Sequence, residues 1–264
     1  MSSLSSGLLT STSQRSESSA APRMVGCVVP SEMVSNADRT EMYRLLETYF
    51  SGTSRQQFEA DLGEKEKVFL LRDSVSSQIQ GFSTSMRLSA NIDGQDVIAF
   101  FSGDTIIARE YWGDSLLARL WSRTVFAEAD LITAARPSTR VYWYLICSGY
   151  RTWRFLPVFF REYWPSLSAP TPAHAQNILD TLGQQKFGRQ YVRGAGVVRF
   201  RAAAPLRGGV SDVTEQRLAD PQIAFFARMN PGHAAGDELA CLTEITPDNL
   251  TRAGRRMVGS PVGQ

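Results

Sequence analysis

The chain has 264 residues, with 28 basic side chains against 26 acidic ones and 43% hydrophobic residues. This is the composition of an ordinary globular protein, long enough to bury a large core without disulfide bonds. The net charge is only +2, and the basic residues form no concentrated stripe, which argues against a nucleic-acid binder. The same mild charge gives no reason to expect a membrane-surface protein. No apolar run reaches the length that a membrane-spanning helix needs.

The cysteines and histidines are few and scattered. Cys27, Cys147 and Cys241 lie far apart without CxxC spacing, and His174 and His233 are the two histidines. Neither a disulfide framework nor a metal site is expected from this pattern. We therefore predict a soluble protein of the reducing cytoplasm.

Composition along the chain suggests how it is divided. Residues 1–23 are rich in Ser with few large apolar groups, so a disordered tail is expected there. A folded core is expected over residues 24–165, with an extension over residues 166–254 that packs on it. Residues 255–264 are expected to be a frayed tail.

Apolar periodicity predicts the elements of the first half of the chain. They are a strand over 24–29, a helix capped by Asp38 and ending at Phe50, a helix over 54–62, and strands over 68–72, 79–90 and 97–109. Asp93-Gly94 predicts a hairpin between the second and third of these later strands. Ser102-Gly103-Asp104 interrupts the third strand and predicts a β-bulge.

The second half begins with a long amphipathic helix. The expected elements are a helix over 114–135, a strand over 141–146, an aromatic helix over 150–163 broken near Pro157, a helix over 172–186, and strands over 197–202, 223–228 and 238–244. The strand over 141–146 is wholly apolar, which is typical of a strand buried on both faces of a sheet. Strands and helices in this order predict an α/β (α+β) domain with a mixed sheet.

The turn between the bulged strand and the long helix is the most informative feature for function. The first turn of a helix has backbone N–H groups without partners and a partial positive charge, which suits phosphate. Gly113 would let a ligand approach the backbone, and the Ser115 hydroxyl could add a donor. Asp114 would repel phosphate unless it points away, and it could equally be a simple N-cap.

In this stretch the sequence resembles the GNAT superfamily of CoA-dependent acyltransferases. The resemblance covers about residues 38–165 and rests on the order of elements and on the run from Arg109 to Leu117. The family pattern is Gln or Arg, two residues, Gly, one residue, then Gly or Ala. Glu110, Gly113 and Ser115 occupy those places, and Gly113 fits. The resemblance implies a mixed, twisted sheet with helices on both faces, here followed by a C-terminal extension.

The resemblance also implies a site for acetyl-CoA or another acyl-CoA as co-substrate. The acyl arm would lie where the bulged strand splays from the strand at Val141, and the pyrophosphate would lie at the helix start. The residues implied for this site are Ile106, Ile107, Ala108, Arg109, Gly113, Asp114, Ser115 and Leu116. A backbone N–H near the bulge would polarise the thioester carbonyl.

Catalytic candidates follow from position relative to that site. Tyr150 stands where the superfamily often keeps its acid, although a packing role is the stronger interpretation from sequence alone. Glu110 and Asp104 are candidate bases by position, and each could be a solvated loop carboxylate. Cys147 is more typical of inert core than of a nucleophile.

Two functions remain open from the sequence. The first is an acyl-CoA-dependent N-acyltransferase that moves an acyl group directly to a small-molecule amine or a peptide. The second is a catalytically inactive binding or assembly module with the same fold. The dense aromatic run over residues 143–164 is either core, which we favour, or the lining of an apolar pocket. The C-terminal extension could also form a homodimer contact.

Overall fold

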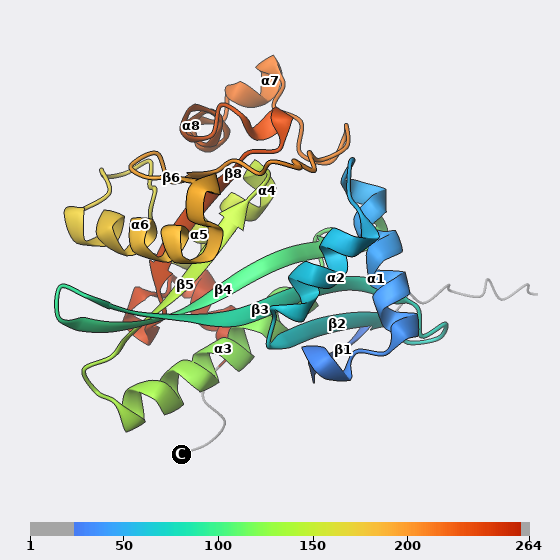
Figure 1. Cartoon of the computed structure of the whole chain (residues 1–264), viewed down its shortest axis with the longest axis horizontal. Coiled ribbons are helices and arrows are strands. Elements are labelled where there is room, and N and C mark those ends of the chain that lie inside the picture. The colour runs from blue at the N-terminus through green and yellow to red at the C-terminus, as the bar shows by residue number, and fades with distance from the viewer. Residues whose placement is uncertain (1–23, 260–264) are drawn as a thin grey trace, which may run out of the picture.

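The computed structural model describes residues 24–259, and both predicted tails fall wholly or partly outside that range. Within it, eight strands form one mixed sheet in the order β1-β2-β3-β4-β5-β8-β7-β6 (Figure 1). The strands are β1 (Met24–Pro30), β2 (Lys67–Asp73), β3 (Ile79–Ile92), β4 (Gln95–Ile107), β5 (Arg140–Cys147), β6 (Tyr191–Val192), β7 (Val197–Val198) and β8 (Glu238–Glu244). Neighbouring strands are antiparallel except β4 and β5, which are parallel.

Helices cover both faces of the sheet, as predicted. They are α1 (Asn36–Tyr49), α2 (Arg55–Gly63), α3 (Leu116–Ala135), α4 (Tyr150–Trp153), α5 (Phe155–Phe159), α6 (Ala173–Phe187), α7 (Glu215–Leu218), α8 (Pro221–Met229) and α9 (Arg252–Val258). Short 3-10 turns are η1 (Ser31–Met33), η2 (Arg109–Tyr111), η3 (Gly188–Gln190), η4 (His233–Ala235) and η5 (Pro247–Asn249). The fold class predicted from the sequence is therefore confirmed.

The two faces have separate apolar cores. Phe82 packs with α1 and α2, and Leu88 packs with α6. Because these two β3 residues are an even number apart, α1, α2 and α6 share one face of the sheet. Leu117 and Trp121 of α3 pack on the other face, together with α4, α5 and α8. No helix within residues 24–259 combines the length and apolarity needed to cross a bilayer.

The predicted bulge in β4 is confirmed. Ser83 of β3 pairs with Thr105 and Ser85 pairs with Ser102, so Thr84 faces two β4 residues. An extra residue of this kind bends a strand and increases its twist. Parallel pairing of β4 with β5 begins at Val97 and Arg140 and ends at Ser102 and Leu145, just before the bulge. Figure 1 shows the two strands diverging beyond that point.

The residues after 165 belong to the same sheet. β8 pairs with β5 on one side and with β7 on the other, so it is an inner strand. Its five central residues, 239–243, are completely buried, as expected for a strand with both edges paired and both faces covered. The chain then continues past Gly254 as α9, whose N-cap Thr251 accepts a hydrogen bond from the Gly254 N–H.

Several predicted elements are wrong in type or extent. Residues 223–228, predicted as a strand, lie in α8, where Asp220 caps the helix and Pro221 takes its first position. An Asp cap followed by Pro is a signal for the start of a helix. The short apolar run after it is equally consistent with a strand, so its pattern alone predicted the wrong element. The strand predicted over 197–202 ends at Val198. The cap of α1 is Ser35, whose hydroxyl accepts from the Asp38 N–H, so Asp38 is not the cap.

The aromatic segment after β5 is broken, as predicted, although the break comes at Arg154 and not at Pro157. Pro157 is accommodated inside α5 because a proline in the first turn removes no intrahelical hydrogen bond. Most of the aromatic side chains of residues 143–164 are buried, including Trp153 and Tyr144 at 0% exposure. This supports the core interpretation of that run.

Candidate functional site

The site is centred on the place where β4 leaves β5. In the described chain, no strand pairs with residues 103–107 of β4 on the side that faces β5. Their backbone groups on that side are therefore available to an extended ligand. We call this region the strand gap, bounded by residues 103–107 of β4 and residues 146–149 at the end of β5.

A tightly held turn connects the strand gap to α3. The backbone N–H of Arg109 donates to the Tyr49 hydroxyl over 2.7 Å, and the Trp112 indole N–H donates to the Ile107 carbonyl over 2.9 Å. Gly113 has φ +101°, and a Cβ placed there would meet nothing within 4 Å. A residue other than glycine would be strained at this φ, while space for a ligand is present.

The start of α3 already holds a carboxylate. Oδ1 of Asp114 accepts a hydrogen bond of 2.6 Å from the backbone N–H of Leu116, the first residue of the helix. The Ser115 side chain makes no capping hydrogen bond. Ser115 holds the N-cap position, so Asp114 is not the N-cap, but its carboxylate occupies one N–H of the first turn and places negative charge where phosphate was expected.

Positive charge gathers beside the same turn. The guanidinium carbons of Arg109 and Arg151 lie 5.0 and 4.7 Å from the Trp112 ring centroid. Arg151 and Arg217 both lie 5.9 Å from the ring of Tyr150. Distances of this size permit cation–π attraction. We call Arg109, Arg151 and Arg217 the arginine cluster.

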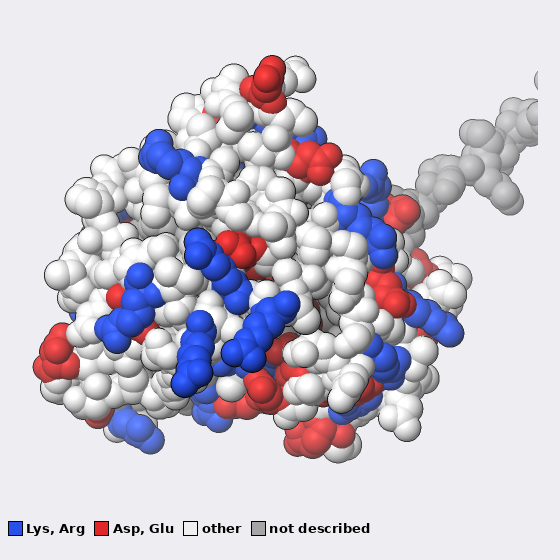
Figure 2. Space-filling model, turned by 45° about the horizontal axis from the view of Figure 1, so that its top comes forward, with Lys and Arg blue, Asp and Glu red and all other residues white. Residues whose placement is uncertain are grey.

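No Asp or Glu among residues 24–259 forms an ion pair with any member of the arginine cluster. Figure 2 shows basic and acidic side chains interspersed over one face of the molecule, with some of the basic ones away from any acidic side chain. Guanidinium groups without carboxylates suit a phosphate ligand. Sequence reasoning identified Arg109 but missed Arg151 and Arg217, since only the fold brings them to Tyr150.

The predicted site residues of the turn form one continuous segment. Ile106 and Ala108 are buried, Ile107 and Leu116 are half-buried, and Arg109, Gly113, Asp114 and Ser115 are exposed. Of the predicted catalytic residues, Tyr150 is 6% exposed at the start of α4, and Glu110 is exposed on η2. Tyr150 thus lies against the arginine cluster, whereas Glu110 faces solvent.

Carboxyl groups gather at the α1–α2–α6 side of the strand gap. Asp104 stands at the bulge of β4, and burial raises its pKa to about 6, with Asp61 raising it further and Lys65 lowering it. Glu238 begins β8, and burial raises its pKa to about 8. The Ser148 hydroxyl lowers that pKa, and the charges of Asp104 and Asp61 raise it. Sequence reasoning considered Asp104 but not Glu238, which is distant in the chain.

A buried lysine stands next to these carboxyl groups. The Lys65 side chain is completely buried, pairs with the Asp61 carboxylate, and has its Nζ 5.7 Å from the Phe101 ring centroid. A Cβ on Gly103 would lie 2.8 Å from Lys65 Cε, so glycine at the bulge allows this lysine to pack against β4. A second lysine, Lys186 of α6, has its Nζ 5.5 Å from the same Phe101 ring centroid. Lys186 forms an ion pair with Glu64.

Residues 203–212 connect the two sides of the strand gap. The Ser51 N–H donates to the Pro205 carbonyl and the Arg207 N–H to the Tyr49 carbonyl, which fixes the segment to the end of α1. Farther along, the Ser211 hydroxyl packs against Gly149, just past β5. Figure 1 shows this orange segment running from the end of α1 to the β8 side of the molecule.

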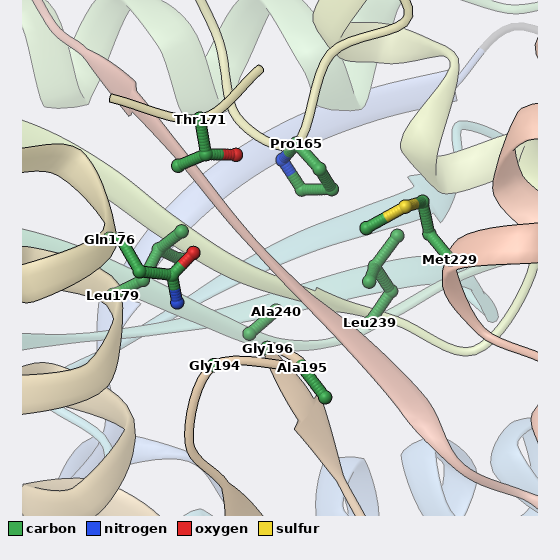
Figure 3. Close-up of a pocket in the computed structure, with 10 residues that line it drawn as sticks. All are labelled: Pro165, Thr171, Gln176, Leu179, Gly194, Ala195, Gly196, Met229, Leu239 and Ala240. Atoms are coloured by element: carbon green, nitrogen blue, oxygen red, sulfur yellow. The ribbon is translucent and has the colours of Figure 1, made fainter. Parts of the chain in front are cut away.

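Two hollows lie outside this region. One of about 30 Å³ lies between α6, the Gly194–Gly196 turn and β8, lined also by Met229 (Figure 3). It has room for about one water molecule. The other, of about 300 Å³, lies where β4–β5 pairing begins, beside Val97 and Thr139. Neither contains the residues predicted for catalysis or co-substrate binding.

The surroundings of Cys147 and His233 determine how readily each side chain ionises. Cys147 is completely buried, and burial raises its thiol pKa well above the usual value, so a thiolate nucleophile is not expected there. Its Sγ lies 4.0 Å from that of Cys241 on the neighbouring strand. His233 is half-buried on η4, and burial lowers its pKa. No cluster of metal-ligating side chains occurs within the described part of the chain.

Comparison with known proteins gives structural likenesses only. No family model matches the chain, and no curated protein matches it in sequence. A probable N-acyltransferase of Enterococcus faecalis matches with a TM-score of 0.37 and 15% identity, over 53% of this chain and 33% of that one. The chain therefore spans about a third of the length of that protein.

Two further solved structures are each similar over about half of the chain. A GNAT family N-acetyltransferase (YhbS) from Escherichia coli in complex with CoA matches with a TM-score of 0.35 and 16% identity, over 52% of this chain and 69% of that one. Arabidopsis thaliana NAA60 in complex with acetyl-CoA matches with a TM-score of 0.37 and 12% identity, over 53% and 87%.

Proposed function

We propose that the protein is an acyl-CoA-dependent N-acyltransferase that transfers the acyl group directly to an amine. The end of β4–β5 pairing at Ser102 and Leu145 carries this proposal, because it leaves β4 with backbone groups for an extended acyl-pantetheine arm. The E. coli and Arabidopsis structures with CoA and acetyl-CoA bound support acyl-CoA as the co-substrate. A cytoplasmic location and a small-molecule or peptide acceptor belong to the same proposal.

The turn before α3 offers such a co-substrate open space and positive charge. Gly113 leaves open space, and the arginine cluster offers three guanidinium groups without acidic partners. Asp114 occupies the first turn of α3, so the pyrophosphate would bind mainly to the arginine cluster unless Asp114 turns away. Ser115 and the N–H groups of the turn would add further donors.

The chemistry would use the strand gap and Tyr150. A β4 backbone N–H near the bulge would stabilise negative charge on the thioester oxygen as the amine attacks. Tyr150 would give its proton to the departing thiolate, and Glu110 remains a candidate base by position. The new bond joins the amine nitrogen to the acyl carbon, and the carbon–sulfur bond breaks.

Calorimetric titration with acetyl-CoA and with S-acetyl-pantetheine tests the proposal. The second ligand retains the acyl arm and lacks the nucleotide phosphates, so it probes the strand gap alone. We expect Arg151→Ala to weaken acetyl-CoA binding about fivefold, since an exposed charge pair contributes about 1 kcal/mol. The same variant should bind S-acetyl-pantetheine as the wild type does. Arg161→Ala, which changes an exposed arginine away from the cluster, is the control.

Absence of acetyl-CoA binding by the wild type at millimolar ligand would contradict the enzyme proposal and favour the non-catalytic binding module. Equal acetyl-CoA affinity of wild type and Arg151→Ala would instead move the phosphate site away from the arginine cluster.

A further inference from the structure

β1 forms one edge of the sheet and is paired on one side only. Within residues 24–259, β2 is the only strand that pairs with β1, and no turn or loop forms a backbone hydrogen bond with it. Figure 1 shows β1 at the outer margin of the sheet, beside β2. A strand in this position presents a row of backbone N–H and C=O groups with which another strand can pair.

This edge lacks most of the features that keep edge strands from pairing with other chains. Natural edge strands are usually short, charged, bulged or interrupted by proline. β1 has seven residues, none of them charged, and its one proline, Pro30, is the last of them. Its register with β2 is regular from end to end, whereas the β2–β3 and β3–β4 registers each contain a shift. The opposite edge of the sheet, β6, has two residues, so β1 is the edge that can support a long pairing.

One face of β1 is fixed to the protein and the other faces solvent. Met24 and Val28 pack against the core that contains α3, and a Cβ on Gly26 would lie 3.1 Å from a Leu120 methyl group. These contacts hold the strand in an extended conformation, so pairing would cost little ordering of the backbone. Neighbouring residues of a strand point to opposite faces. On the solvent face, Val25 is 54% exposed and Cys27 is an exposed free thiol.

We propose that β1 pairs with β1 of a second copy of this chain, antiparallel and centred on Cys27, so that the two sheets join edge to edge. A two-fold axis brings the same strand of both copies together in the antiparallel sense. Cys27 is the middle residue of the seven, so only a register centred on it pairs the whole strand. Cys27 then lies opposite the partner's Cys27, and Gly26 lies opposite the partner's Val28.

A second copy suits this edge because the strand is complementary to itself. No charge occurs in β1, so no like charges meet across the two-fold axis. Main-chain hydrogen bonds would supply the affinity, as in other complexes formed by strand addition. The contact is small, so we expect a weak dimer whose population depends on concentration. β2 and β3 separate β1 from β4, so the strand gap stays accessible in both copies.

Sedimentation equilibrium of the full chain, from about 1 μM to about 100 μM, tests whether the dimer forms. We expect the dimer to increase over this range. Diamide should then link the two copies through Cys27, because opposed residues of an antiparallel pair have Cβ atoms nearly as close as those of a disulfide. The reagent takes up two protons and two electrons as the S–S bond forms. Cys27→Ser should dimerise without this link, since Cys147 and Cys241 are buried.

Charged residues at position 27 test the register. Cys27→Lys and Cys27→Glu should each raise the dissociation constant of the dimer about fivefold, because two like charges then lie directly opposite each other. An equimolar mixture of the two variants should restore dimerisation, because Lys then faces Glu. Ser89→Lys and Ser89→Glu place the same charges on an exposed residue of β3 and should leave the dimer unchanged. Thermal melts check that all four variants fold.

Three outcomes would overturn this proposal. A full chain that stays monomeric over the whole range contradicts it, including the case in which residues 1–23 of the same chain cover β1. A dimer that forms no Cys27 link, or that the charges at residue 27 leave unchanged, uses another surface. Failure of the Lys and Glu variants to restore pairing when mixed refutes the two-fold register centred on Cys27.

Discussion

The carboxylate of Asp114 accepts a 2.6 Å hydrogen bond from the backbone N–H of Leu116, so an anion of the protein itself lies at the start of α3. An anion at this position is favourable for the helix because it opposes the macrodipole. The same charge opposes a phosphate ligand. The helix start and the arginine cluster beside it thus have opposite electrostatic effects on co-substrate binding.

Asp114→Asn should separate these effects. The asparagine side-chain oxygen can accept the same hydrogen bond from the Leu116 N–H, so stability should change by less than about 0.5 kcal/mol. Loss of the negative charge should tighten acetyl-CoA binding about two- to fivefold, measured by calorimetry at low salt. Asp130→Asn removes the same charge from the exposed part of α3 and should leave the affinity unchanged. Weaker binding by Asp114→Asn would mean that the carboxylate contacts the ligand favourably.

Gly113→Val should impair both stability and co-substrate binding. At φ +101° a branched side chain costs roughly 1–3 kcal/mol of backbone strain, although no neighbour stands within 4 Å of its Cβ. The side chain would also occupy the open space beside the turn, so the dissociation constant for acetyl-CoA should rise about tenfold or more. The effect of Arg109→Ala should be smaller, since it removes one exposed charge.

Gly94→Val is the matched control for this variant. Gly94 has φ +80° and open space around its Cβ, and it lies in the β3–β4 hairpin away from the turn. Thermal melts should show a similar loss of stability in both variants, while only Gly113→Val loses affinity. Equal affinity of both variants for acetyl-CoA would place the co-substrate elsewhere.

The sequence was sufficient to predict the fold up to β5. Asp93-Gly94 and the glycine between two apolar half-strands predicted the hairpin and the bulge, because both signals are local. The apolar face of α3, with Leu117, Trp121 and Val125, was equally readable. The α8 region failed because its apolar run suits a strand or a buried helix, and the capping residue Asp220 decides between them.

The site was only partly predictable. Arg109, Gly113 and Asp114 lie in one short segment, so spacing alone brought them into consideration. Arg151 and Arg217 come together at Tyr150 through packing of residues distant in the chain. Glu238 reaches the strand gap because β8 pairs with β5, a long-range contact that no local pattern indicates.

Tyr150→Phe should separate binding from catalysis. The ring that packs against Arg151 and Arg217 is kept, so acetyl-CoA affinity should stay within about twofold of wild type. If the hydroxyl protonates the thiolate, kcat should fall about 100-fold in a thiol-release assay. Tyr43→Phe, on α1 and away from the arginine cluster, is the control. Unchanged kcat would leave Tyr150 a packing residue, the alternative that the sequence favoured.

The stability of the protein should fall as pH rises from about 4.5 to about 8. Glu238 has an ordinary pKa of 4.5 when unfolded and about 8 when folded, and Asp104 rises from 3.8 to about 6. The folded state therefore keeps protons that the unfolded chain has released, and the free energy of unfolding declines with pH across this window. Both groups are stabilising below their unfolded pKa values, and this contribution is lost as pH rises past their folded pKa values.

Urea unfolding at pH 5, 6, 7 and 8 should give a decreasing midpoint for the wild type. Glu238→Gln should remove most of the decrease between pH 6 and 8, because glutamine keeps the shape and cannot ionise. A wild-type midpoint that rises over this window, or an unchanged slope in Glu238→Gln, would show that Glu238 ionises normally in the folded protein.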